Sequence, residues 1–101
     1  MSRIDQLQKL LASEPADLFL NFALAMELSK LGRTDESLAQ FDRVIALNEH
    51  YAAAYFQKAK TQLAAGDHHS AKATLELGIE RAKSGGDQHA ADEMSELLAA
   101  L

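Results

Sequence analysis

Four histidines and fifteen carboxylates are the side chains in this sequence that could bind a metal ion or move a proton. His68 and His69 are adjacent, whereas His50 and His89 stand apart from them in the sequence. A closed metal site needs several ligands that share one helix face or one loop, and the spacing of these histidines does not indicate such a set. We therefore expect no metal site.

Catalysis by a nucleophile or by paired carboxylates is not indicated by the sequence either. The chain has no cysteine, which excludes a cysteine nucleophile, a thiolate metal site and a disulfide framework. The neighbouring acids Asp35-Glu36 and Asp92-Glu93 would point to different sides of a helix, so they suit helix capping and solvation. The sequence therefore predicts a protein that is not an enzyme and that holds no cofactor.

Phosphate and nucleic-acid ligands are disfavoured by the loops and by the charge. Residues 83–86, Lys-Ser-Gly-Gly, precede a helical pattern but lack the spacing of a phosphate-binding loop, so we interpret them as a flexible connector. The formal net charge is −5, and residues 87–101 contain acids but no Lys or Arg. Because an acidic surface repels phosphate backbones, we expect no nucleic-acid partner.

The composition favours one small all-α domain. The chain has 101 residues, which is enough for one hydrophobic core. Its hydrophobic content is 48% with only 6% aromatic residues, so most of the apolar mass is Ala and Leu, which suits closely packed helices. No apolar run approaches the roughly 18 residues that a membrane span needs. We expect a soluble, unexported, cytoplasmic protein without a membrane partner.

A period of 34 residues organises the chain. Gly32 and Gly66 are 34 residues apart, and further small or apolar residues superimpose at the same interval. These pairs are Phe22 with Phe56, Ala25 with Ala59, Leu31 with Ala65, Ser37 with Ala71, Phe41 with Leu75, and Ile45 with Ile79. So many coincidences in one register indicate an internal repeat.

Each period contains two helical patterns bounded by cap and stop signals. Ser2 can cap a first helix that ends before Pro15, and Asp17 begins a second helix that Gly32 closes. Gly66 repeats the stop signal, because glycine accepts the left-handed backbone of a helix end without strain. The predicted helices cover about residues 2–14, 17–31, 34–48, 51–65, 67–83 and 87–101.

Apolar stripes on these helices predict the core. Gly78 interrupts the fifth helix, where a glycine costs about 1 kcal/mol relative to Ala, and we expect close helix packing as the compensation. Residues at helical spacing form four stripes, namely Ile4, Leu7, Leu10 and Leu11; Ala52, Tyr55, Phe56, Ala59 and Leu63; Ala71, Leu75, Leu77 and Ile79; and Ala90, Ala91, Met94, Leu97, Leu98 and Leu101.

A 34-residue period with two helices resembles the tetratricopeptide repeat. The series Ala25, Gly32, Ser37, Phe41 and Val44, repeated as Ala59, Gly66, Ala71, Leu75 and Gly78, is similar to that family's alternation of small and large residues. The resemblance implies a right-handed α-solenoid of antiparallel helix pairs, with about six helices. It assigns residues 1–14 to an N-terminal half-repeat, 17–50 and 51–83 to two repeats, and 87–101 to a capping helix.

The chain departs from the family pattern at Lys58 and Gln62, at Asn21, which replaces the common Trp, and at Asn48-Glu49, which replaces the second acid-proline pair. Lys58 and Gln62 stand where large apolar residues are usual, and we interpret them as part of a groove wall or of a polar contact between two copies. The carboxylate clamp of chaperone-binding family members needs Lys and Asn at groove positions where this chain has Phe22 and Met26. We therefore do not expect that clamp to operate here.

In tetratricopeptide stacks the first helix of each repeat lines a concave groove, and the resemblance assigns groove positions to this chain. These positions are Phe19, Phe22, Met26, Ser29 and Lys30 in the first repeat, and Ala53, Phe56, Lys60, Leu63 and Ala64 in the second. The aromatic residues and Met26 would form an apolar floor beside Lys30 and Lys60. The alternative interpretation is that these residues are inter-helix core, with Phe22 and Phe56 the most buried.

Two functional hypotheses follow from the sequence. The first is a non-enzymatic adaptor whose groove binds a peptide or helix of another protein. The second is a structural domain that buries its apolar groove by self-association, for example in a homodimer.

Overall fold

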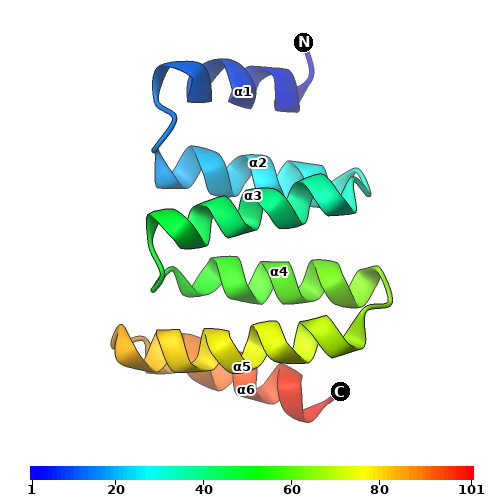
Figure 1. Cartoon of the computed structure of the whole chain (residues 1–101), viewed down its shortest axis with the longest axis vertical. Helices are drawn as coiled ribbons and strands as arrows, with labels where there is room; N and C mark the ends of the chain where they lie inside the picture. The colour runs from blue at the N-terminus through cyan, green and yellow to red at the C-terminus, as the bar shows by residue number, and fades with distance from the viewer.

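The computed structural model describes all 101 residues and contains six α-helices that run antiparallel in sequential order (Figure 1). Each helix packs on the next, and the stack extends along the longest axis of the molecule. The helices are α1 (Arg3–Ser13), α2 (Leu18–Lys30), α3 (Thr34–Leu47), α4 (Ala52–Ala64), α5 (His68–Ser84) and α6 (Gln88–Ala99). The predicted all-α class is confirmed, and the helix ends agree within about two residues.

Local capping explains where most of the helices begin. At α1, the Ser2 hydroxyl accepts a hydrogen bond from the Asp5 N–H, and the Asp5 carboxylate accepts one from the Ser2 N–H. The carboxylates of Asp17, Asp67 and Asp87 accept the N–H three residues further on, at the start of α2, α5 and α6. Each bond satisfies a backbone donor that the first helical turn leaves without a partner.

Glycines in the left-handed region follow α2, α4 and α5. Gly32, Gly66 and Gly86 have φ angles of +72°, +83° and +81°. A residue with a Cβ atom would cost about 1–2 kcal/mol in this conformation. The stop signals at Gly32 and Gly66 are therefore confirmed, and Gly86 supplies a third one before α6.

The stack is more closely packed on one side than on the other. In Figure 1, α3 overlaps α2 and α5 overlaps α6 toward the viewer. Here α2 contacts α4 and α4 contacts α6, whereas α3 and α5 make no close backbone contact with each other. The extents of 40 × 30 × 17 Å match a slab two helices thick, given a helix diameter of about 10 Å. We call the side formed by α2, α4 and α6 the inner face.

Three apolar clusters hold the stack together, and each joins neighbouring helices only. The first joins α1 to α2 through Ile4, Leu7, Leu24 and Leu28. The second joins α2, α3 and α4 through Ala25, Phe41, Val44 and Ala54. The third joins α4, α5 and α6 through Ala52, Tyr55, Ala59, Leu75, Ala82, Ala91 and Met94. Such a core, spread along the stack, is the expected arrangement for helical repeats.

Two residues of the predicted stripes lie outside the core. Leu10 is 53% exposed and Leu77 is 42% exposed, so the stripe prediction is wrong for both. Leu7 and Leu11 take the positions that pack on α2, and α1 has no second neighbour to cover Leu10. Leu77 lies with Ile45 along the gap between α3 and α5, which do not close over it.

Gly78 lies where α5 packs closely on both α4 and α6. A Cβ atom on Gly78 would lie 2.6 Å from Tyr55 Cβ and 2.7 Å from Met94 Sδ. Favourable contacts between carbon atoms lie at about 3.5–4.0 Å, so these helices could not keep their spacing with a larger residue. The close packing predicted for Gly78 is confirmed.

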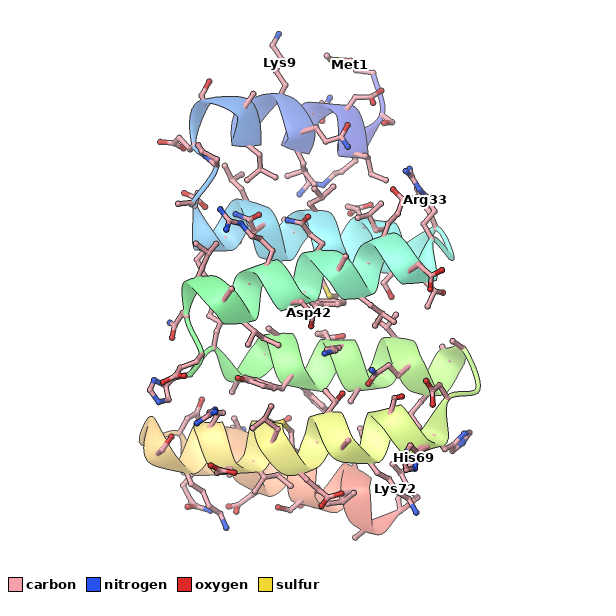
Figure 2. The ribbon with its side chains drawn as sticks, viewed as in Figure 1. Met1, Lys9, Arg33, Asp42, His69 and Lys72 are labelled. Carbon is pink, nitrogen blue, oxygen red and sulfur yellow. The ribbon has the colours of Figure 1, made fainter.

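Polar residues of α4 that replace the family's apolar ones are paired within the fold. Gln62 is buried, and its Oε1 accepts a hydrogen bond of 2.7 Å from the Thr74 hydroxyl of α5. Lys58 Nζ lies 2.7 Å from an Asp42 carboxylate oxygen, and Figure 2 labels Asp42 on the side of α3 nearest α4. The interpretation of Gln62 as a groove wall or a contact between copies is wrong, because Gln62 joins α4 to α5. Lys58 is directed toward α3.

Candidate partner-binding face

The ten predicted groove residues all lie on α2 and α4, which touch each other along the inner face. Ser29 and Thr61 share a hydrogen bond of 2.8 Å between their hydroxyls. Thr61 donates its hydrogen to the Gln57 carbonyl, so Ser29 must be the donor to Thr61. Ser29 therefore ties α2 to α4 and its hydroxyl is already used. Thr61 was not predicted, and nothing in the repeat register singles it out.

Phe19 is the most exposed large hydrophobic residue of the predicted set. It lies in the first turn of α2 and is 68% exposed. Ala53, in the first turn of α4, is also exposed. Both residues therefore offer apolar surface that a partner could cover.

Phe22 and Met26 belong partly to the core and partly to the surface. Both are half-buried and pack against the second apolar cluster. The Phe22 ring lies edge-on to Phe41 at 6.0 Å and to Tyr51 at 5.3 Å between ring centroids. Such edge-to-face pairs hold a ring in one orientation. Phe22 is thus anchored from inside the fold while part of it remains in contact with solvent.

Phe56 occupies the corresponding place on α4. It is half-buried against the third cluster, and Lys60 Nζ lies 4.4 Å from the centroid of its ring, which is a cation–π contact. Leu63 is half-buried, and Ala64 at the end of α4 is exposed. Phe22 and Phe56 therefore fit neither interpretation alone, because each ring packs against the core and is still partly exposed to solvent.

The two predicted cations are exposed but are not equally free. Lys30 Nζ lies 3.5 Å from a Glu27 carboxylate oxygen, and the same Glu27 oxygen lies 3.5 Å from Arg3 of α1. Lys60 has its ammonium over the Phe56 ring. Lys30 is therefore part of a surface ion-pair group, whereas the ammonium of Lys60 contacts an aromatic ring of its own helix.

A pocket of about 200 Å³ lies between α4 and α6 and was not predicted. Its α4 wall includes two predicted groove residues, Ala53 and Phe56, so it continues the same inner face. The residues that line it are Ala52, Ala53, Phe56, Asp87, His89, Ala90, Glu93 and Met94. The predicted groove stopped at α4 because the 34-residue register is lost before α6. The N-caps of α2 and α4, Asp17 and Tyr51, are 34 residues apart, whereas Tyr51 and the N-cap of α6, Asp87, are 36 residues apart.

Carboxylates dominate the charge on α6. Glu93 lies 3.1 Å from His89 Nε2, and this pair is ionic only when His89 is protonated. Asp92 accepts a hydrogen bond of 2.8 Å from Gln88, and Asp87 caps the helix through the Ala90 N–H. Because residues 87–101 contain no Lys or Arg, no permanent cation of α6 balances these acids.

The residues considered for acid–base or metal chemistry lie apart in the fold. Figure 2 labels His69 at the start of α5, and no group of three His, Asp or Glu side chains could hold a metal ion. Glu36 forms an ion pair of 2.6 Å with Arg33, and this hydrogen bond lowers the pKa of Glu36 and raises that of Arg33. Burial raises the pKa of the Tyr55 phenol. These shifts arise from helix-end and core contacts, away from the inner face.

None of the six helices combines the length and the apolar character that crossing a membrane requires. No curated protein sequence matches the chain.

Several solved structures share the fold over most of their length. A protein from Bordetella parapertussis is 24% identical, with 99% of this chain and 87% of that chain covered and a TM-score of 0.84. A tetratricopeptide repeat domain protein from Salinibacter ruber is 27% identical, with 85% and 87% covered and a TM-score of 0.78. The TPR2B domain of yeast Sti1 is 23% identical, with 95% and 77% covered and a TM-score of 0.85.

The model of a tetratricopeptide repeat family matches residues 28–101. The match covers well over half of the chain and includes α3 to α6, so it contains the helices that form the pocket. It agrees with the 34-residue period, with the glycines that follow α2 and α4, and with the sequential antiparallel packing of the six helices. The chain therefore belongs to the tetratricopeptide repeat family.

Proposed function

We propose that this chain is a non-enzymatic adaptor whose inner face binds a peptide or helix of another protein. Tetratricopeptide repeat domains generally serve protein–protein interaction, and the TPR2B domain of yeast Sti1 is known in complex with pHsp70. The observation that supports the proposal is the apolar surface that the predicted groove positions of α2 and α4 leave in contact with solvent. Phe19 is exposed, and Phe22, Met26 and Phe56 are half-buried.

The floor can supply enough free energy for specific binding. Fully burying one Phe side chain contributes about 1.5–3 kcal/mol, and Phe19 still has 68% of its surface in water. Each 1.4 kcal/mol changes an affinity about tenfold, so covering Phe19 alone could strengthen binding by about tenfold or more. Met26 adds a flexible thioether that adapts to differently shaped partners.

The experiment is a selection of peptides from a random display library on the immobilised chain, followed by fluorescence polarisation with each selected peptide. The test variant is Phe19→Glu, because Phe19 is exposed and its replacement should leave the helices intact. Phe22→Glu is less suitable, since Phe22 packs on Phe41 and Tyr51. We expect Phe19→Glu to weaken binding by about tenfold or more.

The matched control is Leu77→Glu, which places the same charge at an exposed apolar residue along the gap between α3 and α5. It should leave the affinity unchanged, and circular dichroism should show equal helicity in both variants. Peptides that bind Phe19→Glu as tightly as the unmodified chain would refute the inner face as the binding site.

A second copy of the chain is the alternative occupant of this face. The observation that favours it is a second large exposed apolar residue on the same segment, since Leu31 just after α2 is 63% exposed. The net charge of −5 opposes close approach of two copies. Light scattering behind a sizing column, over a wide range of loading concentrations, tests this alternative. A dimer that Phe19→Glu converts to a monomer would establish it.

A further inference from the structure

The pocket between α4 and α6 is too small for a separate small-molecule ligand but suits one side chain. Ligand pockets usually have volumes of about 300–1,000 Å³, and this one has about 200 Å³. It adjoins the apolar floor, because Phe56 belongs to both. A segment that lies along the floor would therefore pass over the pocket and could place one side chain in it.

The pocket combines an apolar interior with a carboxylate rim. Met94 and Ala52 are buried at its base, and Ala53 and Phe56 form the α4 wall. The charged or titratable residues that line it are Asp87, His89 and Glu93. A side chain that fits such a pocket has an apolar stem and a cationic end, which describes Lys and Arg.

We propose that this pocket receives a Lys or Arg side chain of the bound partner segment, with its stem on Phe56 and Met94 and its charge on Glu93. The proposal rests on the proposed function and adds the charge of the partner. Asp87 is partly committed to capping α6, through a bond of 3.0 Å from the Ala90 N–H. Glu93 is the freer acid, since its only neighbour within ion-pair distance is His89.

The charges around the pocket favour a cation over an anion. The nearest lysine on α4 is Lys60, and its ammonium is held 4.4 Å over the Phe56 ring, one turn further along the helix. An incoming acid would meet the carboxylates of Asp87 and Glu93, and α6 offers it no Lys or Arg. Like charges across an interface suppress the wrong partner, so the pocket should select basic segments.

The experiment uses the peptides selected from the random library on the unmodified chain. We expect the peptides that lose affinity on Phe19→Glu to share a Lys or Arg at one position. Replacing that residue by Gln in the peptide should weaken binding to the unmodified chain by about 3- to 10-fold. On Glu93→Gln the same peptide replacement should change nothing, because the acid that contacts the cation is gone.

Glu76→Gln is the matched control, since Glu76 is an exposed acid of α5 away from the pocket. On this variant the Lys-to-Gln or Arg-to-Gln change in the peptide should keep its full effect. Two outcomes would overturn the pocket proposal alone. In the first, the peptides sensitive to Phe19→Glu share no basic residue. In the second, replacing the shared Lys or Arg of the peptide by Gln weakens binding to Glu93→Gln as much as binding to the unmodified chain. A library without any peptide sensitive to Phe19→Glu would overturn both proposals.

Discussion

Replacing Gly78 by Ala should destabilise the protein, although Ala is the better helix former. Gly78 lies inside α5, where the substitution by itself would gain about 1 kcal/mol of helix propensity. Against this, the added Cβ atom would lie 2.6 Å from Tyr55 Cβ and 2.7 Å from Met94 Sδ. The two effects have opposite signs, so the measured free energy of unfolding decides between them.

The packing effect should be the larger one. Both contacts fall roughly 1 Å short of an ordinary van der Waals separation. The Met94 sulfur can move, but Tyr55 Cβ is attached to the backbone of α4, so relief there requires α5 to shift away from α4. Overpacking of a well-packed core costs about 1–3 kcal/mol. Since Tyr55 Cβ cannot move without the backbone, the overpacking cost should lie in the upper part of this range, at about 2–3 kcal/mol. After the gain of about 1 kcal/mol in helix propensity, we expect a net loss of about 1–2 kcal/mol.

Urea unfolding followed by far-ultraviolet circular dichroism measures this loss, and thermal unfolding should show a decrease of about 4–8 °C for each kcal/mol. The control is Ala73→Gly, at an exposed position of the same helix, which reports helix propensity without a packing change. It should cost about 1 kcal/mol. A Gly78→Ala variant as stable as the unmodified chain, or more stable, would refute the conclusion that close packing requires Gly78.

Three further predictions concern buried or strained groups. Tyr55→Phe removes a hydrogen bond of 2.7 Å to the Glu49 carbonyl and should cost about 0.5–1.5 kcal/mol in urea unfolding. Burial raises the pKa of Tyr55 above its ordinary value of 10.0. The stability linked to this shift is complete below about pH 10 and is lost as the pH rises through the folded-state pKa. The free energy of unfolding of Tyr55→Phe should therefore fall less between neutral and alkaline pH than that of the unmodified chain. Thr74→Val leaves Gln62 Oε1 buried without a donor and should cost about 1–3 kcal/mol, whereas adding Gln62→Leu should recover most of that loss in a double-mutant cycle. Gly66→Ala, at a φ of +83°, should cost about 1–2 kcal/mol by thermal unfolding. A variant with unchanged stability would contradict this prediction and show that the α4–α5 connection relaxes without cost.

The starts and stops of the helices could be predicted because they depend on neighbouring backbone atoms. Asp17 caps α2 through an N–H three residues away, and Gly32 and Gly66 can adopt positive φ because glycine lacks the Cβ atom that would collide with the following carbonyl. The close approach at Gly78 could also be predicted, since a mid-helix glycine is unfavourable unless packing compensates for it.

The exposure of individual apolar residues was less predictable, because periodicity identifies the apolar side of a helix but not its neighbours. Leu10 and Leu77 fit the stripes and yet are exposed, since no helix covers that side of α1 and no contact closes the gap between α3 and α5. Phe22 and Phe56 fit both groove and core, and their half-burial depends on how far the adjacent helices cover each ring.

The sequence by itself determined the family and the six helices, because caps, glycines and a 34-residue period are local or repeated signals. Only the tertiary structure decided that Ser29 is used to hold α2 on α4, and that α6 lies beside α4 to form a pocket with Glu93 at its rim. Both depend on side chains about 30 or more residues apart in the chain, which helix packing brings together. The N-caps of α4 and α6 are 36 residues apart, so the 34-residue register does not predict that these two helices lie side by side. In the folded chain α6 packs on α5 and also contacts α4.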